Sequence, residues 1–137
     1  DNAVIGVRCA AHIFNLIAQD AYHKTPLKTA MGDVEKAIEL GEVKRYCPTR
    51  WNSKFDSLKE TLEKATLSDI ESQRIQAAVS SMKAVAVAID VVQTRTASVY
   101  DVFMQFELVR ASWEELATLN PSLSVQLLTI WDARFKL

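Results

Sequence analysis

The residue types best suited to chemistry gather in one stretch, KRYCPTRWNSKF, which runs from Lys44 to Phe55. It contains no acidic residue, and its cations are Lys44, Arg45, Arg50 and Lys54. Such cations can neutralise phosphate groups, and the rings of Trp51 or Tyr46 can stack on an unpaired base. The stretch therefore predicts contact with nucleic acid. The alternative is a surface loop that leads into a helix, with Trp51 as an ordinary core residue.

Zinc binding is the second chemistry to consider, because Cys9 and His12 have the spacing of a zinc half-site. A structural zinc site needs four ligands, such as His23 and Cys47 in addition, and no second closely spaced pair exists. A buried thiol and a histidine at a helix start are the favoured interpretation, so we expect no metal in this chain. The sequence also lacks a nucleophile motif and a glycine-rich phosphate loop.

Size and charge limit the function classes. The chain has 137 residues and 15.3 kDa, which is the size of one domain. A net charge of −1 and a pI of about 6.2 argue against a wholly basic nucleic-acid binder, so any phosphate contact must come from a local patch. Two cysteines are typical of a reducing compartment, and no apolar run is long enough to predict a membrane span. The missing initiator methionine and the abrupt end indicate a piece of a longer protein.

The elements that position these residues are expected to be helices, since only three glycines and three prolines interrupt the chain. Apolar residues at helical spacing predict helices over 11–22, 26–40, 50–65, 69–93 and 99–119, and from 121 onward. Residues 3–9 (AVIGVRC) are apolar and rich in β-branched side chains, which predicts a strand. The expected fold is mainly α, a bundle of five to six helices with at most one or two short N-terminal strands.

Local signals predict the helix ends and the buried faces. Gly41 is expected to end the second helix and Thr49 to cap the third. A serine followed three residues later by an acid predicts capping boxes at Ser68 and Ser98. The apolar stripe of the third helix is expected to be Trp51, Phe55, Leu58 and Leu62. Buried lines are expected at Ile75, Val79, Met82, Val85, Ile89 and Val92, and at Val99, Val102, Phe106, Val109, Trp113 and Leu116.

Three segments resemble the hAT transposases, the hobo–Activator class. RCAAHIFNLIAQD (8–20) resembles the C-x-x-H segment of that family, and CPTRWNSKFDSL (47–58) resembles its P-T-R-W-N-S block. MKAVAVAIDVVQTRTASVYDVF (82–103) is similar to a helix–turn–helix stretch of the same proteins. The segments follow the family's order and span nearly the whole chain.

The resemblance implies a nuclear DNA transposase with a DDE-type, RNase H-like core and a helical insertion. Residues 1–24 would be a remnant of the core, and 25–137 would be insertion-like. The intact parent would use Mg²⁺ or Mn²⁺ on three carboxylates. Asp1 resembles the second of these, and the others would lie outside residues 1–137, so this chain alone is expected to be inactive.

The resemblance also assigns roles within the chain. Trp51, with Arg50 beside it, would stabilise a flipped base or hairpin end of transposon DNA, assisted by the neighbouring Lys44, Arg45 and Lys54. Cys9, His12 and Asn52 match family motif positions. A helix over residues 13–17 would cover a sheet in the family, so self-association through residues 1–24 is expected here. The alternative function is a transposon-derived helical module that binds protein and has no DNA activity.

Overall fold

The computed structural model of the chain describes residues 2–47, 52–94 and 96–135, with side chains described from residue 10 onward. These ranges contain six α-helices and no strand, which confirms a mainly α bundle. The helices are α1 (Asn2–Lys24), α2 (Leu27–Glu39), α3 (Ser53–Lys64), α4 (Asp69–Gln93), α5 (Val99–Glu115) and α6 (Pro121–Phe135). A short 3₁₀ helix, η1 (Leu116–Thr118), joins α5 to α6.

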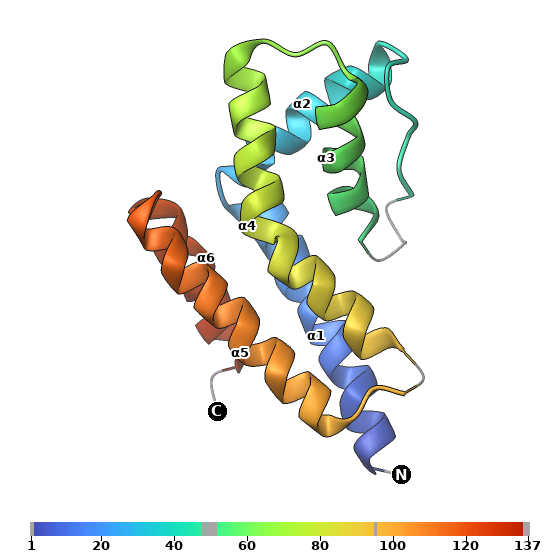
Figure 1. The fold of residues 1–137 in the computed structure, drawn as a ribbon, viewed down its shortest axis with the longest axis vertical. Helices are drawn as coiled ribbons and strands as arrows, with labels where there is room; N and C mark the ends of the chain where they lie inside the picture. Colours follow the sequence, from blue (N-terminus) through green and yellow to red (C-terminus); the bar gives the residue numbers. More distant parts are fainter. Residues whose placement is uncertain (1, 48–51, 95, 136–137) are drawn as a thin grey trace.

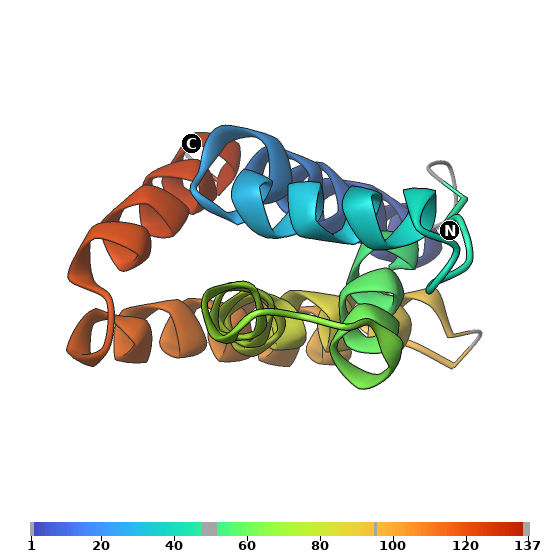
Figure 2. The ribbon, with the colours of Figure 1, turned by 90° about the horizontal axis from the view of Figure 1, so that it is seen from above.

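The helices form two layers, with α4 as the element that most of the others share. In Figure 1, α5 lies beside α4, α1 runs behind α4, and α6 lies behind α5. Figure 2 shows α1 and α2 in one layer and α3, α4 and α5 in the other. Helix α4 contacts α1, α2, α3 and α5, while α6 packs on α5 and returns to α1.

The core follows the apolar periodicity of the sequence. Of the buried line expected on α4, Ile75, Met82, Val85, Ile89 and Val92 are buried, and Val79 is half-buried. On α5 the expectation holds for Val109 and Trp113 and is wrong for Val99, which is 51% exposed because it lies at the first turn, past the end of α4. The ring of Phe14 on α1 lies about 6.3 Å from the rings of Phe106 and Trp131 and 6.4 Å from that of Phe135. These aromatic contacts bring the first helix onto the last two.

The predicted strand over residues 3–9 is wrong, because these residues belong to α1. The spacing of the apolar residues favours a helix, because Val4, Val7, Ala11 and Phe14 follow one another at intervals of three, four and three residues. The β-branched composition indicated a strand, but that preference is weak and depends on a neighbouring strand. No strand is present in the described residues to pair with it.

Two of the predicted helix ends rest on capping boxes that the structure confirms. Ser68 accepts a hydrogen bond from the N–H of Glu71, whose carboxylate accepts from the N–H of Ser68. Ser98 and Asp101 form the same pair at α5. Gly41 follows α2 with a φ of +74°, a conformation that favours glycine.

The start of α3 differs from the expectation. Thr49 lies outside the described residues, and the helix begins at Ser53 rather than near residue 50, with Asn52 as its N-cap. Asn52 adopts a φ of +64°, the left-handed region that asparagine tolerates better than most residues. Of the stripe expected on α3, Phe55 and Leu58 are buried and Leu62 is half-buried, whereas Trp51 lies outside the described residues.

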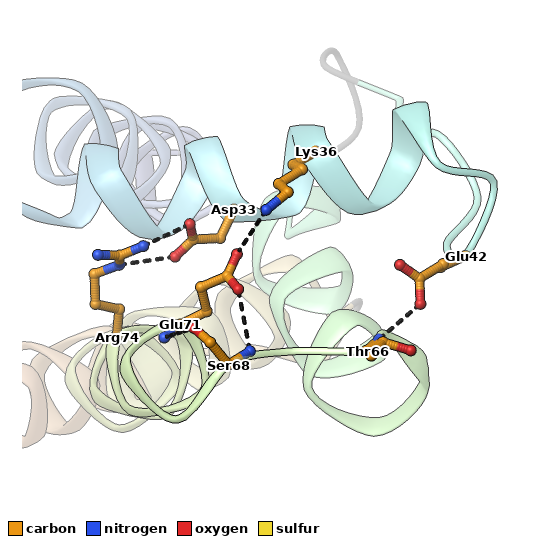
Figure 3. A network of polar contacts seen from close by, with 7 residues as sticks. All are labelled: Asp33, Lys36, Glu42, Thr66, Ser68, Glu71 and Arg74. Atoms are coloured by element: carbon orange, nitrogen blue, oxygen red, sulfur yellow. Dashed lines mark hydrogen bonds and ion pairs between the residues drawn. The ribbon is translucent and has the colours of Figure 1, made fainter.

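A polar clamp fixes α2 against α4 (Figure 3). Asp33 on α2 is buried and accepts hydrogen bonds from Nε and Nη2 of Arg74, each 2.9 Å long. Lys36 lies 3.5 Å from Glu71 of the capping box. Beyond the end of α2, a carboxylate oxygen of Glu42 accepts a hydrogen bond of 2.7 Å from the N–H of Thr66. The clamp therefore holds the end of α2 against α4 and fixes the point at which the connection to α3 begins.

Helix α4 is the one described helix that is long and apolar enough to cross a membrane by length and composition alone. The core helix of a globular bundle meets the same criterion. Here Ile75, Met82 and Ile89 of this helix are buried against the rest of the chain, so the core role accounts for its composition.

The apolar face of α1 is covered within the chain. Phe14, Ile17 and Ala21 are buried, and α1 contacts α2, α4, α5 and α6. Self-association through residues 1–24 stays a prediction, and with this face already covered it would require exchange of α1 between copies or contact through its outer side.

Candidate nucleic-acid interface

The described part of the basic stretch, residues 44–47 and 52–55, covers part of the connection between α2 and α3 and the start of α3. Lys44 and Arg45 are exposed on it, next to the buried Val43, which anchors the connection to the core. Arg45 lies 3.6 Å from Glu35 of α2, and both side chains are largely open to solvent. An exposed ion pair of this kind contributes little stability, so it does not prevent Arg45 from contacting a phosphate. The side chain of Lys44 is accessible to a phosphate as well.

The centre of the predicted site, Arg50 and Trp51, lies outside the described residues. The segments on either side of it are fixed by described contacts. The hydroxyl of Ser53 donates a hydrogen bond to the carbonyl oxygen of Cys47, six residues earlier. Asn52 Nδ2 donates to the carbonyl oxygen of Ala86 at 2.8 Å and to the carboxylate of Asp90 at 2.9 Å, both on α4. Asn52, which lies in the segment that resembles the P-T-R-W-N-S block, thus joins the start of α3 to the central helix.

Lys54, the fourth predicted cation, is half-buried against α1. Its Nζ donates to Oε1 of Gln19 at 2.9 Å, lies 2.8 Å from Nε2 of His23, and sits 5.7 Å above the ring of Tyr22. Burial lowers the pKa of Lys54. An ammonium group has three donors, and two of them are used here, so Lys54 is held in place rather than extended into solvent like Lys44.

The groups around Lys54 share its partly desolvated setting. Burial, followed by the charges of Lys54 and Lys28, lowers the pKa of His23, which favours its neutral ring as a partner of the ammonium. Burial and the charge of Asp56 raise the pKa of Tyr22, so its hydroxyl keeps its proton at neutral pH. This cluster has no local signal in the sequence, because Lys54 lies 31 residues from His23 and 35 from Gln19.

The remaining predicted residues do not meet in a metal site within the described part of the chain. Asp1 and the side chain of Cys9 lie outside it, and His12 is exposed on α1. No group of three or more His, Cys, Asp or Glu side chains that could hold a metal ion occurs among the described residues. The two-metal centre implied for an intact parent does not fit these residues, and no catalytic step is derived from it.

Comparison of the chain with protein-family models, curated proteins and solved structures gives no match. The hAT resemblance therefore rests on the three segments alone. The structure places residues 8–20 within α1; of the segment 47–58, it describes Cys47 in the α2–α3 connection, Asn52 as the N-cap of α3, and residues 53–58 in the first half of α3. Residues 82–103 form a helix, a turn and a helix, from α4 into α5. The first two segments lie side by side, because Lys54 of one contacts Gln19 of the other.

Proposed function

We propose that this chain is a DNA-contacting helical module of a hAT-type DNA transposase and does not catalyse strand transfer alone. The observation that carries the proposal is the position of Lys44 and Arg45, exposed on the surface connection that leads directly to Arg50 and Trp51. Cations in this position can hold phosphates of a DNA strand while an aromatic ring stacks on an unpaired base. Nuclear location, and metal ions in the intact parent, follow from the same proposal.

The anchoring of the connection supports this role. Recognition of a flipped base needs a ring held by rigid neighbours, because ordering a mobile loop reduces affinity. Val43, Ser53 and Asn52 tie the two sides of the stretch to the bundle. The helices therefore serve as a scaffold that presents the basic stretch.

We expect Trp51→Ala to weaken binding to hairpin or single-stranded DNA and to leave binding to plain duplex nearly unchanged. Loss of one stacked base costs about 1–3 kcal/mol, which corresponds to roughly 5- to 150-fold in the dissociation constant. Fluorescence anisotropy with labelled hairpin and duplex oligonucleotides at one fixed salt concentration measures the difference. Tyr100→Ala, which removes an exposed ring on α5, is the matched control and should change neither affinity.

Salt titration separates the charge contribution in the same assay. Lys44→Ala and Arg45→Ala should each reduce the slope of log K against log salt by about 0.9, the value for one lost phosphate contact. Lys83→Ala, at an exposed position of α4, should leave the slope unchanged. Equal loss on hairpin and duplex for Trp51→Ala would exclude base stacking, and a slope insensitive to Lys44 and Arg45 would contradict phosphate contact.

The outer face of α5 supports a second candidate, a helical module that binds protein. Tyr100 (70% exposed), Met104 (41%) and Leu108 (51%) form an apolar row along it at intervals of four residues, with Phe103 (67%) beside them. A row of this kind fits the groove of a partner helix bundle, and such exposed apolar surface often marks interaction sites.

Leu108→Glu distinguishes this candidate from the first. If α5 binds protein, this variant loses a partner that the unchanged chain retains in co-purification, and it keeps its helical circular dichroism. Lys83→Glu on α4 serves as the matched control and should retain the partner. A chain that binds hairpin DNA with Leu108→Glu in place, and shows no Leu108-dependent partner, rules the second candidate out.

A further inference from the structure

The exposed apolar row lies on a strongly negative helix. Helix α5 contains four acidic side chains and one basic side chain, so its net charge is −3, whereas the whole chain has a net charge of −1. The basic residue, Arg110, is paired with Glu114 at 3.0 Å. Glu107 and Glu115 are exposed, and their carboxylates have no ion pair or hydrogen bond within the residues that the structure describes. The outer side of α5 is therefore both apolar and negative.

The row extends to Glu115 along α5 and sideways onto α4. Glu115 follows Leu108 by seven residues, which is two helical turns, so it lies on the same side of α5. Helix α4 runs antiparallel beside α5 (Figure 1), in the register set by the hydrogen bond from Trp113 to the carbonyl oxygen of Ser81. That register places Val87 of α4, which is 44% exposed, close to the level of Leu108. The resulting surface, the α4–α5 face, consists of Val87, Tyr100, Met104, Glu107, Leu108 and Glu115.

A hollow of about 340 Å³ lies where this face meets η1. Glu115 is the only charged residue among the described residues that line it, and Ser80 and Ser112 add hydroxyl groups. Leu116 and Leu119 supply apolar surface beside them. A carboxylate and hydroxyl oxygens can accept hydrogen bonds from an ammonium or guanidinium group, and apolar side chains can cover the methylene groups that carry it. The hollow therefore fits the end of a lysine or arginine side chain.

Charge selects among the possible occupants of the α4–α5 face. Its carboxylates repel the phosphates of DNA and of an anionic membrane surface. Two copies of the chain that met through this face would bring the Glu107 and Glu115 carboxylates of both into one interface, where like charges lower the affinity. A helix that carries apolar side chains on one side, with lysine or arginine next to them, complements both the apolar and the negative part of the face.

We propose that the α4–α5 face is a docking site for a basic amphipathic helix of a partner protein. Apolar side chains of that helix pack on Met104, Leu108 and Val87, and one of its lysine or arginine side chains enters the hollow beside Glu115. The proposal names the kind of partner that the second candidate function requires and rests on that function. It does not depend on DNA contact by the basic stretch.

Titration with an amidated helical peptide of leucine and lysine, with leucines at intervals of three and four residues, tests the site. We expect saturable binding in calorimetry. Leu108→Glu should weaken it at least about tenfold, because a carboxylate would be buried against leucine side chains. Glu115→Lys should weaken it several-fold and should improve binding of a matched peptide with glutamate in place of lysine.

Two exposed positions away from the face supply matched controls. Val125→Glu on α6, where the side chain is 64% exposed, and Glu63→Lys on α3 should bind the leucine–lysine peptide like the unchanged chain. Because every substituted side chain is exposed or half-exposed, each variant should keep its helical circular dichroism.

Absence of saturable binding, or binding that Leu108→Glu and Glu115→Lys leave unchanged, overturns the proposal. If the peptide fails to bind while a Leu108-dependent protein partner co-purifies, the second candidate function survives and the basic helix is rejected. A dimer that Leu108→Glu converts to a monomer in light scattering assigns the face to a second copy and also rejects it. If the peptide binds through Leu108 and Glu115 and hairpin DNA does not bind, the docking site is supported and the DNA function is contradicted.

Discussion

Replacing Trp113 with alanine is expected to lower the free energy of unfolding by about 3–5 kcal/mol, the usual cost of removing a buried aromatic side chain. Trp113 is fully buried on α5, and its ring centroid lies 6.0 Å from that of Trp131. Its indole N–H also donates a hydrogen bond of 2.9 Å to the carbonyl oxygen of Ser81 on α4. The change removes packing from α4, α5 and α6 together, which a urea denaturation curve would report as a lower midpoint with little change in slope.

Two further variants separate the contributions within Trp113. Trp113→Phe keeps most of the apolar volume and loses only the indole hydrogen bond, so it should cost about 0.5–1.5 kcal/mol, because the Ser81 carbonyl keeps its helical hydrogen bond within α4. Leu119→Ala serves as the surface control, because Leu119 is 87% exposed, and it should stay within about 0.5 kcal/mol of the unchanged chain. A loss below about 1 kcal/mol for Trp113→Ala would contradict the described core.

The second large effect is expected at Asn52, where Asn52→Ala should cost about 2–5 kcal/mol of stability. It removes the hydrogen bonds to Ala86 and Asp90, each contributing about 0.5–1.5 kcal/mol. It also forces an alanine into the left-handed region, which costs about 1–2 kcal/mol more. Chemical denaturation monitored by far-ultraviolet circular dichroism measures the loss.

Two substitutions at the same position distinguish backbone from side chain. Asn52→Gly accepts the positive φ but cannot bond α4, so it should destabilise less than Asn52→Ala. Asn52→Asp should destabilise more at neutral pH, because it places a carboxylate against the carbonyl oxygen of Ala86 and the carboxylate of Asp90, and it should recover partly in acid. If the glycine and alanine variants are equally stable, the left-handed backbone at residue 52 is not a source of the loss.

The helices were predictable because their signals are local. Each capping box, at Ser68 and at Ser98, joins residues three positions apart. The apolar line from Ile75 to Val92 repeats every three or four residues. Both kinds of signal have their expected role in the structure. The strand prediction for residues 3–9 is wrong because it used only a local signal. The β-branched composition of these residues favours a strand, but the helical spacing that continues to Phe14 outweighs it. A preference taken from seven residues leaves out the longer helix to which they belong.

The candidate site was predictable only in part, because its contacts join distant segments. The sequence singled out Lys44, Arg45 and Lys54 as cations but not the burial of Lys54 against α1. Nothing in the sequence indicates that Asp33 is buried, because its partner Arg74 is 41 residues away. Such pairs follow from how α2 and α4 cross, which no spacing along the chain encodes.

The enclosure of Phe14 by Phe106, Trp131 and Phe135 has a consequence for biosynthesis. Helix α1 is synthesised before the rings that cover it and before Arg134, which pairs with Asp20 at 2.9 Å. The apolar face of the nascent helix therefore stays uncovered until α5 and α6 have been translated. During that interval chaperones or neighbouring nascent chains compete for the face, and synthesis of α6 rather than helix formation sets when the native bundle closes.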